Sequence, residues 1–428
     1  MKTTTRWLVA GLVAALTACG GGLLGNQGRI RLVNATTGLG ALDLLVGNDA
    51  VINGVATATA SDYVLRKADT YSLEIRQTGN AATLLTTSTN LVADKHQSLV
   101  AYNSGGVMAA TVLDDEESDP GRNKAKFRVF NTATAAADQV DVYLVTTPCN
   151  TLDTSPAAPT AAAVSGLQTA YTELASSATA YRLCVTSAGD KTDVRLEIPS
   201  FVLTDQRIVT VILARGAGGY LMNAIVLDQQ GAATPALNVS ARARVATSVP
   251  VPVSVVVNGT PISAGLPPAN VGPYVLVPAG PVTVTVNSTA VTPVAPLTAA
   301  PGTDLTVLLT GATPTTTLLA DDNTPSSSTA RPVKLRLVNG LNGTTTAATL
   351  TLNNVLVGSA TLPAQASGYT QVASSAGLAR LEARVGTGQF YLNPSATLEA
   401  NGVYSLFLLG DGSAPPTLPN LGILVPDR

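Results

Sequence analysis

The single histidine, His96, is the first residue to consider for catalysis in this chain of 428 residues. A Ser-His-Asp hydrolase would need its imidazole as the general base. His96 lies in the segment Asp94–Gln97, and no Gly-x-Ser-x-Gly nucleophile turn occurs upstream or downstream of it. A cysteine nucleophile would need Cys149 or Cys184 beside a histidine that belongs to a different part of the chain. We therefore expect His96 to be a solvated loop residue and the chain not to be an enzyme.

Two other kinds of chemistry need weighing. The glycine-rich segment 216–219 could cradle a phosphate, but it lies between two apparent strands, so a hairpin turn is the better interpretation. A pair of carboxylates at glycosidase spacing could hydrolyse a glycoside. Carboxylates are few and fall mostly at strand ends or in turns, so an unrecognised glycosidase-like hydrolase is kept only as a second alternative.

One acidic cluster contains Asp114, Asp115, Glu116 and Asp119. Carboxylate oxygens crowded at a boundary between domains suit Ca²⁺, which makes these four residues a candidate metal site. Calcium is the only cofactor that the sequence suggests. The favoured interpretation is a solvated acidic exit from a last strand, because EF-hand spacing is missing and Asp228, at a later junction, has no such cluster around it.

The third cysteine, Cys19, follows an apolar run of about 12 residues, too short to span a bilayer. The run, 7–18, stands behind Lys2 and Arg6 and has the length and flanks of a signal peptide. Its end, Leu16–Cys19, resembles the lipobox of bacterial lipoproteins. That resemblance implies cleavage before Cys19, acylation of its thiol and anchoring in the membrane, with the outer membrane favoured because no Asp follows. The alternative is an ordinary secretory signal.

Cys149 and Cys184 are then left as an even pair. The periplasm and the cell surface are oxidising, so a disulfide is expected. It would close a loop of about 36 residues and contribute roughly 3–4 kcal/mol on the loop-entropy model. The alternative is two free buried thiols that behave as small hydrophobic side chains.

The composition excludes several classes of protein. Only 12% of residues are charged, the net charge is −2, and hydrophobic residues make up 46%. So little basic charge argues against nucleic-acid binding, and so much apolar material argues against extensive disorder. With 37 Gly and 26 Pro among many Thr and Val residues, long helices are improbable and strands are favoured.

A pattern recurs four times along the chain, roughly every 100 residues. A strand of alternating basic and apolar residues begins each copy, at 29–34, 126–131, 242–247 and 334–339. A mid-unit tyrosine follows, at Tyr63, Tyr171, Tyr274 and Tyr369. The copies end in an acid, at Asp114, Asp228, Asp321 and Asp427. The repeated tyrosines are expected to be core or corner residues whose hydroxyls bond to the backbone.

A unit of this size with about seven short strands is typical of an immunoglobulin-like β-sandwich. We therefore expect an all-β protein with four tandem immunoglobulin-like antiparallel β-sandwich domains after a lipoprotein signal peptide. The expected segments are a signal peptide 1–18, a lipidated tether 19–28, and sandwiches 29–117, 126–230, 241–322 and 333–428. An insertion at about 147–180 is expected in the second sandwich, with one short helix within 157–180.

The units resemble an uncharacterised bacterial secreted domain, the domain of unknown function 4397, on the basic-apolar strand, Val140–Tyr143, the mid-unit tyrosine and the closing strand. Copy two carries the pattern best, followed by copy one, whereas Ser254 and Thr349 replace an aspartate in copies three and four. The resemblance implies an exported tandem β-protein and brings no known activity, substrate or catalytic residue.

These observations favour a non-enzymatic cell-envelope lipoprotein that presents tandem sandwiches for binding, adhesion or structural roles. Its expected partners are the membrane, through the lipid anchor, and an unidentified protein or glycan, but not nucleic acid. The first alternative is a ligand- or calcium-binding module protein.

Overall fold

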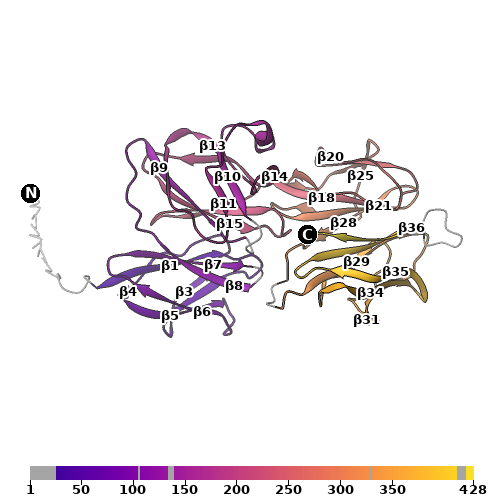
Figure 1. Cartoon of the computed structure of the whole chain (residues 1–428), viewed down its shortest axis with the longest axis horizontal. Helices are drawn as coiled ribbons and strands as arrows, with labels where there is room; N and C mark the ends of the chain where they lie inside the picture. Colours follow the sequence, from indigo (N-terminus) through magenta and orange to yellow (C-terminus); the bar gives the residue numbers. More distant parts are fainter. Residues whose placement is uncertain (1–25, 105–106, 134–138, 327–329, 412–420) are drawn as a thin grey trace, which may run out of the picture.

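The computed structural model describes residues 26–104, 107–133, 139–326, 330–411 and 421–428 (Figure 1). The predicted signal peptide and Cys19 lie outside these residues. Regular structure in the described part is almost entirely β-strand, with one short 3-10 helix, η1 (Cys149–Thr154). None of the described helical structure is long and apolar enough to cross a membrane. The predicted all-β class is confirmed.

The first unit is a sandwich of two four-stranded sheets. Their orders are β4-β1-β7-β8 and β3-β2-β5-β6. The strands are β1 (Gln27–Ala35), β2 (Leu42–Val46), β3 (Asp49–Val55), β4 (Val64–Lys67), β5 (Asp69–Gln77), β6 (Thr83–Leu91), β7 (His96–Ser104) and β8 (Val107–Asp114).

The second unit repeats this plan in sheets β12-β9-β15-β16-β17 and β11-β10-β13-β14. Its strands are β9 (Lys124–Asn131), β10 (Val140–Val145), β11 (Ala161–Val164), β12 (Thr172–Ala175), β13 (Ser177–Ser187), β14 (Asp190–Leu203), β15 (Ile208–Arg215), β16 (Met222–Asp228) and β17 (Ala233–Ala236).

The third unit has sheets β21-β18-β27-β28, with β22 also paired to β18, and β20-β19-β24-β25, besides the short pair β23-β26. Its strands are β18 (Ser240–Thr247), β19 (Val253–Val257), β20 (Thr260–Leu266), β21 (Asn270–Val271), β22 (Val275–Pro278), β23 (Gly280–Pro281), β24 (Val284–Val286), β25 (Thr289–Val291), β26 (Thr298–Ala299), β27 (Asp304–Thr310) and β28 (Thr315–Asp321).

The fourth unit has sheets β32-β29-β36-β37, with β33 also paired to β29, and β31-β30-β34-β35. Its strands are β29 (Val333–Asn342), β30 (Ala348–Leu352), β31 (Val355–Leu356), β32 (Gln365–Ala366), β33 (Thr370–Val372), β34 (Ser375–Val385), β35 (Gly388–Leu398), β36 (Val403–Asp411) and β37 (Leu421–Pro426).

Each sandwich is antiparallel except at one pair. The first strand of every unit runs parallel to a late strand, in the pairs β1–β7, β9–β15, β18–β27 and β29–β36. The first two strands of each unit also lie in different sheets, whereas a constant-type immunoglobulin domain keeps them in one. The sandwich architecture is therefore as predicted, with a connectivity of its own.

The first strands have two buried faces. In β1, Ile30 and Leu32 pack into the core of the unit, while Val33 packs on the opposite face against the next unit. In β29, Leu337 likewise packs into the core of its own unit, and Val338 packs on the opposite face against the neighbouring unit. Side chains alternate along a strand, so the basic residues between the core positions also point at the neighbouring unit.

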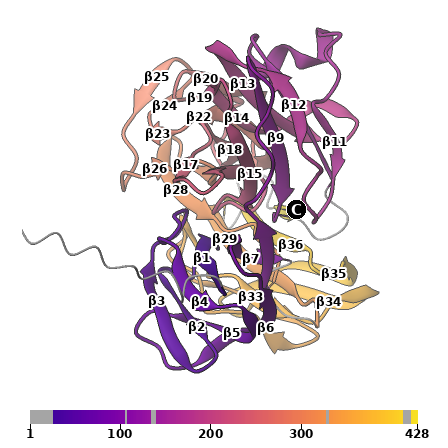
Figure 2. The same ribbon diagram turned by 90° about the vertical axis from the view of Figure 1, so that its left-hand side faces the viewer.

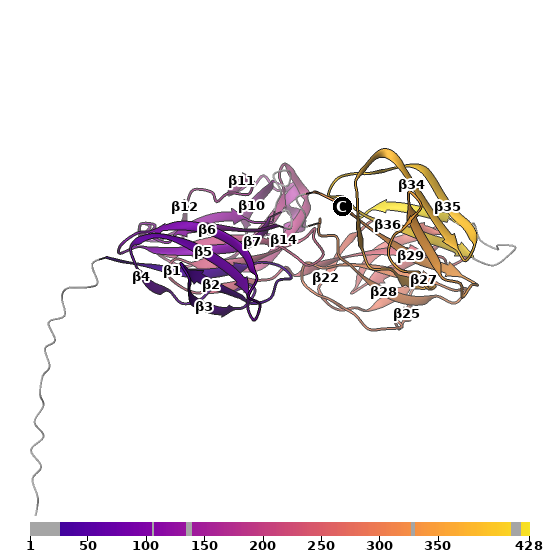
Figure 3. The same ribbon diagram turned by 90° about the horizontal axis from the view of Figure 1, so that it is seen from below.

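The units pack in two pairs through these second faces. Val100 of unit 1 meets Phe130 and Ile212 of unit 2, and Leu308 of unit 3 meets Phe407 of unit 4. Each pair is consequently a stack of four sheets. Figure 2 shows units 2 and 3 above units 1 and 4, and Figure 3 shows the two pairs side by side along the long axis.

The second unit corrects one expectation. The segment 157–180 does not form a helix in the structure; it contains β11 and β12, which take the places of β3 and β4. The extra residues of this unit lie between β10 and β11, at 146–160, and they include the 3-10 helix η1. Alanine favours helix as an isolated residue, but here pairing with β10 and β9 outweighs that preference.

Candidate functional site

A buried arginine on β1 is the centre of a polar cluster between units 1 and 2. Arg31 is 2% exposed; its Nε donates to Ser98 Oγ at 2.6 Å, and its Nη2 pairs with Asp115 Oδ2 at 2.9 Å. The Tyr63 ring lies against the guanidinium, with 4.6 Å between Arg31 Cζ and the ring centroid. The hydroxyls of Tyr63 and Ser98 both donate to Asp115. The guanidinium also donates to the Gly231 and Asp228 carbonyls of unit 2. The buried cation is therefore held by a carboxylate, one hydroxyl, two carbonyls and an aromatic face.

The same residue types recur in each unit. An arginine stands on the first strand, a serine or threonine on its parallel partner, and a tyrosine ring lies against the guanidinium. The sets are Arg31, Ser98 and Tyr63; Arg128, Thr210 and Tyr171; Arg244, Thr306 and Tyr274; and Arg336, Ser405 and Tyr369. The four predicted tyrosines thus all lie against a first-strand arginine, but no backbone group accepts from their hydroxyls in the described contacts. Three hydroxyls donate to carboxylates and that of Tyr171 meets Thr210.

Units 3 and 4 exchange their acids. Arg336 Nη2 of unit 4 donates to Asp321 Oδ1 of unit 3, and Arg244 Nη1 of unit 3 pairs with Asp427 Oδ1 of unit 4 at 2.6 Å. Burial raises the pKa of Asp321, but the guanidinium groups of Arg336 and Arg244 more than offset this and hold that pKa below its usual value. Burial, reinforced by the charge of Asp321, raises the pKa of Tyr274 well above 10. Charge compensation in this pair therefore depends on both units.

The acid of the cluster lies two residues beyond a leucine or valine that faces the hydroxyl residue across the last strand pair. These apolar residues are Leu113, Leu227, Leu319 and Val425, and the positions two residues further on are Asp115, Gln229, Asp321 and Asp427. Asp114 and Asp228 do end β8 and β16, but the position that meets the arginine cluster in units 1 and 2 is one residue later, at Asp115 and Gln229.

Unit 2 lacks the acid. Its equivalent, Gln229, accepts from the Glu117 backbone N–H at 2.9 Å and donates from Nε2 to the Glu117 carbonyl at 2.8 Å. Arg128 Nη2 instead donates to the Asp114 carbonyl at 3.2 Å. Polar groups of units 1 and 2 thus meet mainly through backbone oxygens.

The predicted calcium ligands face different partners. Asp115 points to Arg31, Glu116 Oε1 lies 2.6 Å from His96 Nδ1, and Asp114 ends β8 on the exposed surface. Asp119 lines an open polar surface depression beside Arg207. No group of three or more His, Cys, Asp or Glu side chains that could hold a metal occurs in the part of the chain that the structure describes. The calcium site stays a prediction.

His96 is not a solvated loop residue. It begins β7, and its side chain is only 19% exposed beside Glu116. Its ring meets Tyr63 edge to face, with 4.9 Å between ring centroids. The Ser-Leu-Val sequence that follows His96 favours a strand. His96 belongs to that strand, β7, because it pairs with Arg29 of β1 in the parallel ladder. The imidazole is therefore packed against Tyr63 and hydrogen-bonded to Glu116.

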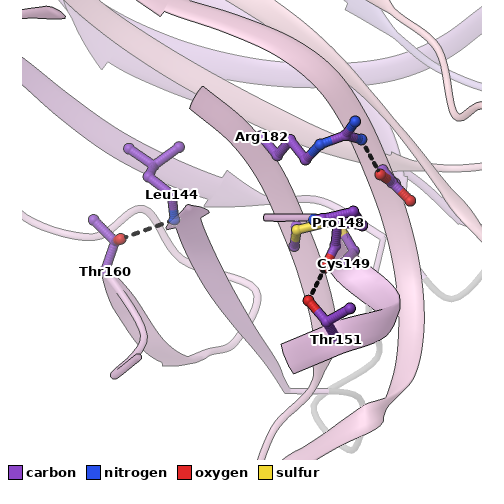
Figure 4. The surroundings of a disulfide bond; sticks show 8 residues. Leu144, Pro148, Cys149, Thr151, Thr160 and Arg182 are labelled. Atoms are coloured by element: carbon purple, nitrogen blue, oxygen red, sulfur yellow. Dashed lines mark hydrogen bonds and ion pairs between the residues drawn. A yellow bond between two sulfur atoms is a disulfide. The ribbon is translucent and has the colours of Figure 1, made fainter. Parts of the chain in front are cut away.

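Cys149 and Cys184 form the predicted disulfide, with 5.6 Å between their Cα atoms (Figure 4). Both are fully buried beside Tyr143 and Leu152. Thr151 donates to the Pro148 carbonyl twice, from Oγ1 at 2.8 Å and from its backbone N–H at 3.1 Å, and the backbone bond closes the first 3-10 turn. The disulfide attaches the extra segment 146–160 to β13, the strand that contains Cys184.

The glycine-rich segment 216–219 is the predicted hairpin, between β15 and β16, and it joins the two pairs. Gly218 N–H donates to the Gly302 carbonyl at 2.9 Å, and the Asn323 N–H donates to the Gly218 carbonyl at 3.2 Å. A Cβ atom on Gly219 would lie 2.4 Å from Thr324 N, so only glycine permits this approach. Next to it, Arg195 and Arg242 stack on the Tyr220 ring, at 3.9 and 3.7 Å from Cζ to the centroid.

A cavity of about 580 Å³ opens where the four units meet. Its lining includes Thr37 of unit 1, Arg215 of unit 2, Asp322 after β28, and Lys334 and Tyr369 of unit 4. Lys334 Nζ pairs with Asp322 Oδ2 at 2.7 Å. No single unit forms this cavity, and it was not visible in the sequence because its walls come from segments that lie far apart in the chain.

The fold and the buried clusters define a tandem β-sandwich protein whose recurring polar residues serve packing. The family model of a domain of unknown function, DUF4397, matches residues 28–143 and 241–340, half of the chain, and the chain belongs to this family. The matches cover unit 1 with the first strands of unit 2, and unit 3 with part of β29. The sequence ranking that placed copy two first is therefore not supported.

No curated protein matches the chain. One solved structure, described as alpha-glucan recognition by family 41 carbohydrate-binding modules from streptococcal virulence factors, has 12% identity and a TM-score of 0.16, covering 43% of this chain and 93% of its own. A solved structure of the TIE protein of Bacillus anthracis has 9% identity and a TM-score of 0.14. The match covers 90% of this chain and 68% of the TIE chain. Likenesses this weak carry no argument about function.

Proposed function

We propose that this chain is a non-enzymatic cell-envelope lipoprotein whose four sandwiches form one rigid body that presents its outer surfaces for binding or for a structural role. Its clustered polar residues are compensated inside interfaces, where they support packing. The proposal includes lipidation at Cys19, attachment to the outer membrane, and a protein or glycan as the partner.

One observation carries the proposal: the exchange of Asp321 and Asp427 between units 3 and 4. A buried charge that loses its partner costs about 3–5 kcal/mol, so separating these units would be expensive. The hairpin 216–219 adds backbone bonds between the two pairs. Flexible tandem domains would instead be joined by exposed linkers with few contacts.

Rigidity is tested by distance measurement between spin labels in the full chain. Labels on the exposed positions Asn80→Cys in unit 1 and Asn354→Cys in unit 4 span the two pairs. The control pair, Asn354→Cys with Thr387→Cys, lies within unit 4. We expect equally narrow distance distributions for both pairs. A several-fold broader distribution between units 1 and 4 would contradict the rigid body.

The envelope assignment has its own test. Labelled palmitate should be incorporated into the wild-type chain and not into Cys19→Ala, which should leave the membrane fraction. Protease treatment of intact cells then distinguishes the two membrane faces, since digestion places the protein outside and protection places it in the periplasm. Equal palmitate labelling of both chains would contradict lipidation at Cys19.

A second candidate function, binding of a small saccharide, is favoured by the cavity at the meeting point of the units. Its walls combine hydroxyl groups, a tyrosine and both signs of charge, as polar ligand sites do. The test is a melting-temperature screen of the full chain with neutral and acidic sugars. A saccharide that raises the melting temperature of the wild type but not of Thr37→Val would support it; no shift with any sugar counts against it.

A further inference from the structure

The side of unit 1 formed by β6 and β8 is open on both layers of the sandwich. β6 is the last strand of one sheet and β8 the last strand of the other, and the two strands lie close together. In the described residues, β6 pairs only with β5, and β8 only with β7. In Figure 1, β6 lies at the bottom of unit 1, away from unit 2.

Unpaired strand edges are templates for further pairing, and proteins normally protect them with charges, prolines, bulges or short strands. β6 has the sequence TLLTTSTNL, without charge or proline, and β8 has a single charge, at its terminal Asp114. β5 and β6 also keep one register without interruption from Asp69–Leu91 to Ile75–Leu85. This edge is therefore long, with no charge or proline in β6, and its pairing with β5 shifts register once, between Ile75–Leu85 and Arg76–Thr83.

The corresponding edges of the other units are protected. In unit 2, β14 carries five charged residues and Pro199, and β17 covers β16. In unit 3, β25 has only three residues. In unit 4, β35 contains Pro394 and its pairing with β34 shifts register three times, while β37 ends at Pro426. Among the described units, unit 1 alone has two long edges free of proline on this side.

We propose that this side of unit 1 is the surface through which two copies of the chain associate, with β6 paired antiparallel to β6 of the second copy. The partner is a second copy because the edge complements itself. Pairing about a two-fold axis near Thr86 places Thr86 opposite itself and Thr83 opposite Thr89, pairs that are favourable across strands, and brings no like charges together. The shared sheet would contain eight strands, four from each copy. Dimer formation would be a function in addition to the one proposed above for a single chain.

The structure also limits the paired segment. Gln97 Nε2 of β7 donates to the Asn90 carbonyl at 3.3 Å. This hydrogen bond occupies a backbone acceptor near the end of β6. The free edge is consequently 83–89. Beside it, β8 offers Val107, which is 42% exposed, so the second layer can bury apolar surface in the same contact.

Sedimentation of the full chain in detergent tests the proposal, with Thr86→Lys and Ser88→Lys combined as the disrupting variant. Both side chains are exposed, so the fold should survive, and lysines that meet across the axis should weaken the dimer about tenfold or more. The matched control is Thr289→Lys on β25, the protected edge of unit 3. A wild type that stays monomeric at the highest attainable concentration would overturn the proposal, as would equal weakening by the control.

Cross-linking gives an independent readout. Thr86→Cys should form a disulfide-linked dimer with a second copy under mild oxidation, whereas Thr289→Cys should not. Cross-linking of Thr86→Cys no faster than that of Thr289→Cys would count against pairing at β6. A Thr86→Cys chain that sediments as a dimer but forms no cross-link under oxidation would place the contact elsewhere and would also overturn the proposal.

Discussion

The Arg336 guanidinium of the fourth unit donates to the Asp321 carboxylate of the third, and both groups are almost completely buried. The return contact joins Arg244 to Asp427, so each unit supplies the acid that its neighbour's arginine pairs with. Neither unit carries both halves of either pair. We therefore expect units 3 and 4 to unfold as one cooperative body.

Arg336→Ala should lower the free energy of unfolding of this pair by about 3–5 kcal/mol, because it leaves the Asp321 charge buried without its main partner. Urea unfolding followed by circular dichroism measures the change. The control is Arg380→Ala. The Arg380 side chain is 37% exposed and its partner Glu382 keeps a second arginine, Arg384, so the loss should be less than about 1 kcal/mol. Losses of equal size would show that the interface pair has no special weight.

The Asp321 pair should also make stability depend on acid pH. The pKa of Asp321 is lower in the folded chain than in the unfolded chain, so its contribution is present above the unfolded value of about 3.9 and is lost as pH falls further. Urea midpoints measured from pH 7 to pH 2.5 should fall more steeply below pH 4 for the wild type than for Asp321→Asn. Parallel curves for the two chains would contradict this assignment. Asp304, whose pKa is raised mainly by burial and in smaller part by the charge of Asp321, contributes with the opposite sign in both chains.

The sequence was sufficient for the features that depend on local pattern. Four copies of the basic-apolar strand, the recurring tyrosines and the even cysteine pair predicted the all-β sandwiches and the disulfide, since strand alternation and turn residues are local signals. The spacing of the exit acids was also present, two residues beyond Leu113 and Leu319. In unit 1 this spacing is ambiguous, because Leu113 is followed directly by two aspartates and only the fold shows that the second, Asp115, points at Arg31.

The packing between units could not be read in this way. A strand that alternates basic and apolar residues predicts one face in water, and only the sheet-to-sheet contacts show that Arg31 and Arg336 are 2% exposed. Strand pairs such as β1 and β7 also join residues about 67 positions apart, beyond the reach of local periodicity. The interfaces between units, the cavity where they meet and the free edge of unit 1 all depend on these non-local contacts.

Loss of the Cys149–Cys184 bond should destabilise unit 2 by about 2–4 kcal/mol, because the unfolded chain regains the freedom of the closed loop. Hydrogen exchange should rise most in 146–160, the segment that the bond holds against β13. Cys149→Ala with Cys184→Ala is compared with the oxidised wild type. Exchange that rises equally in unit 4 would show that the bond does not act locally.

The hairpin between the two pairs gives the sharpest test of the rigid body. Gly219 and Gly189 both have positive φ, +84° and +78°, so alanine strains either position by a similar amount. They differ in surroundings: a Cβ at Gly219 would meet the backbone of Thr324, whereas a Cβ at Gly189 would meet nothing within 4 Å. Gly219→Ala should therefore broaden the distance distribution between labels at Asn80 and Asn354, while Gly189→Ala should leave it narrow. Because local strain is matched, equal distributions in the two variants would mean that the hairpin does not hold the pairs together.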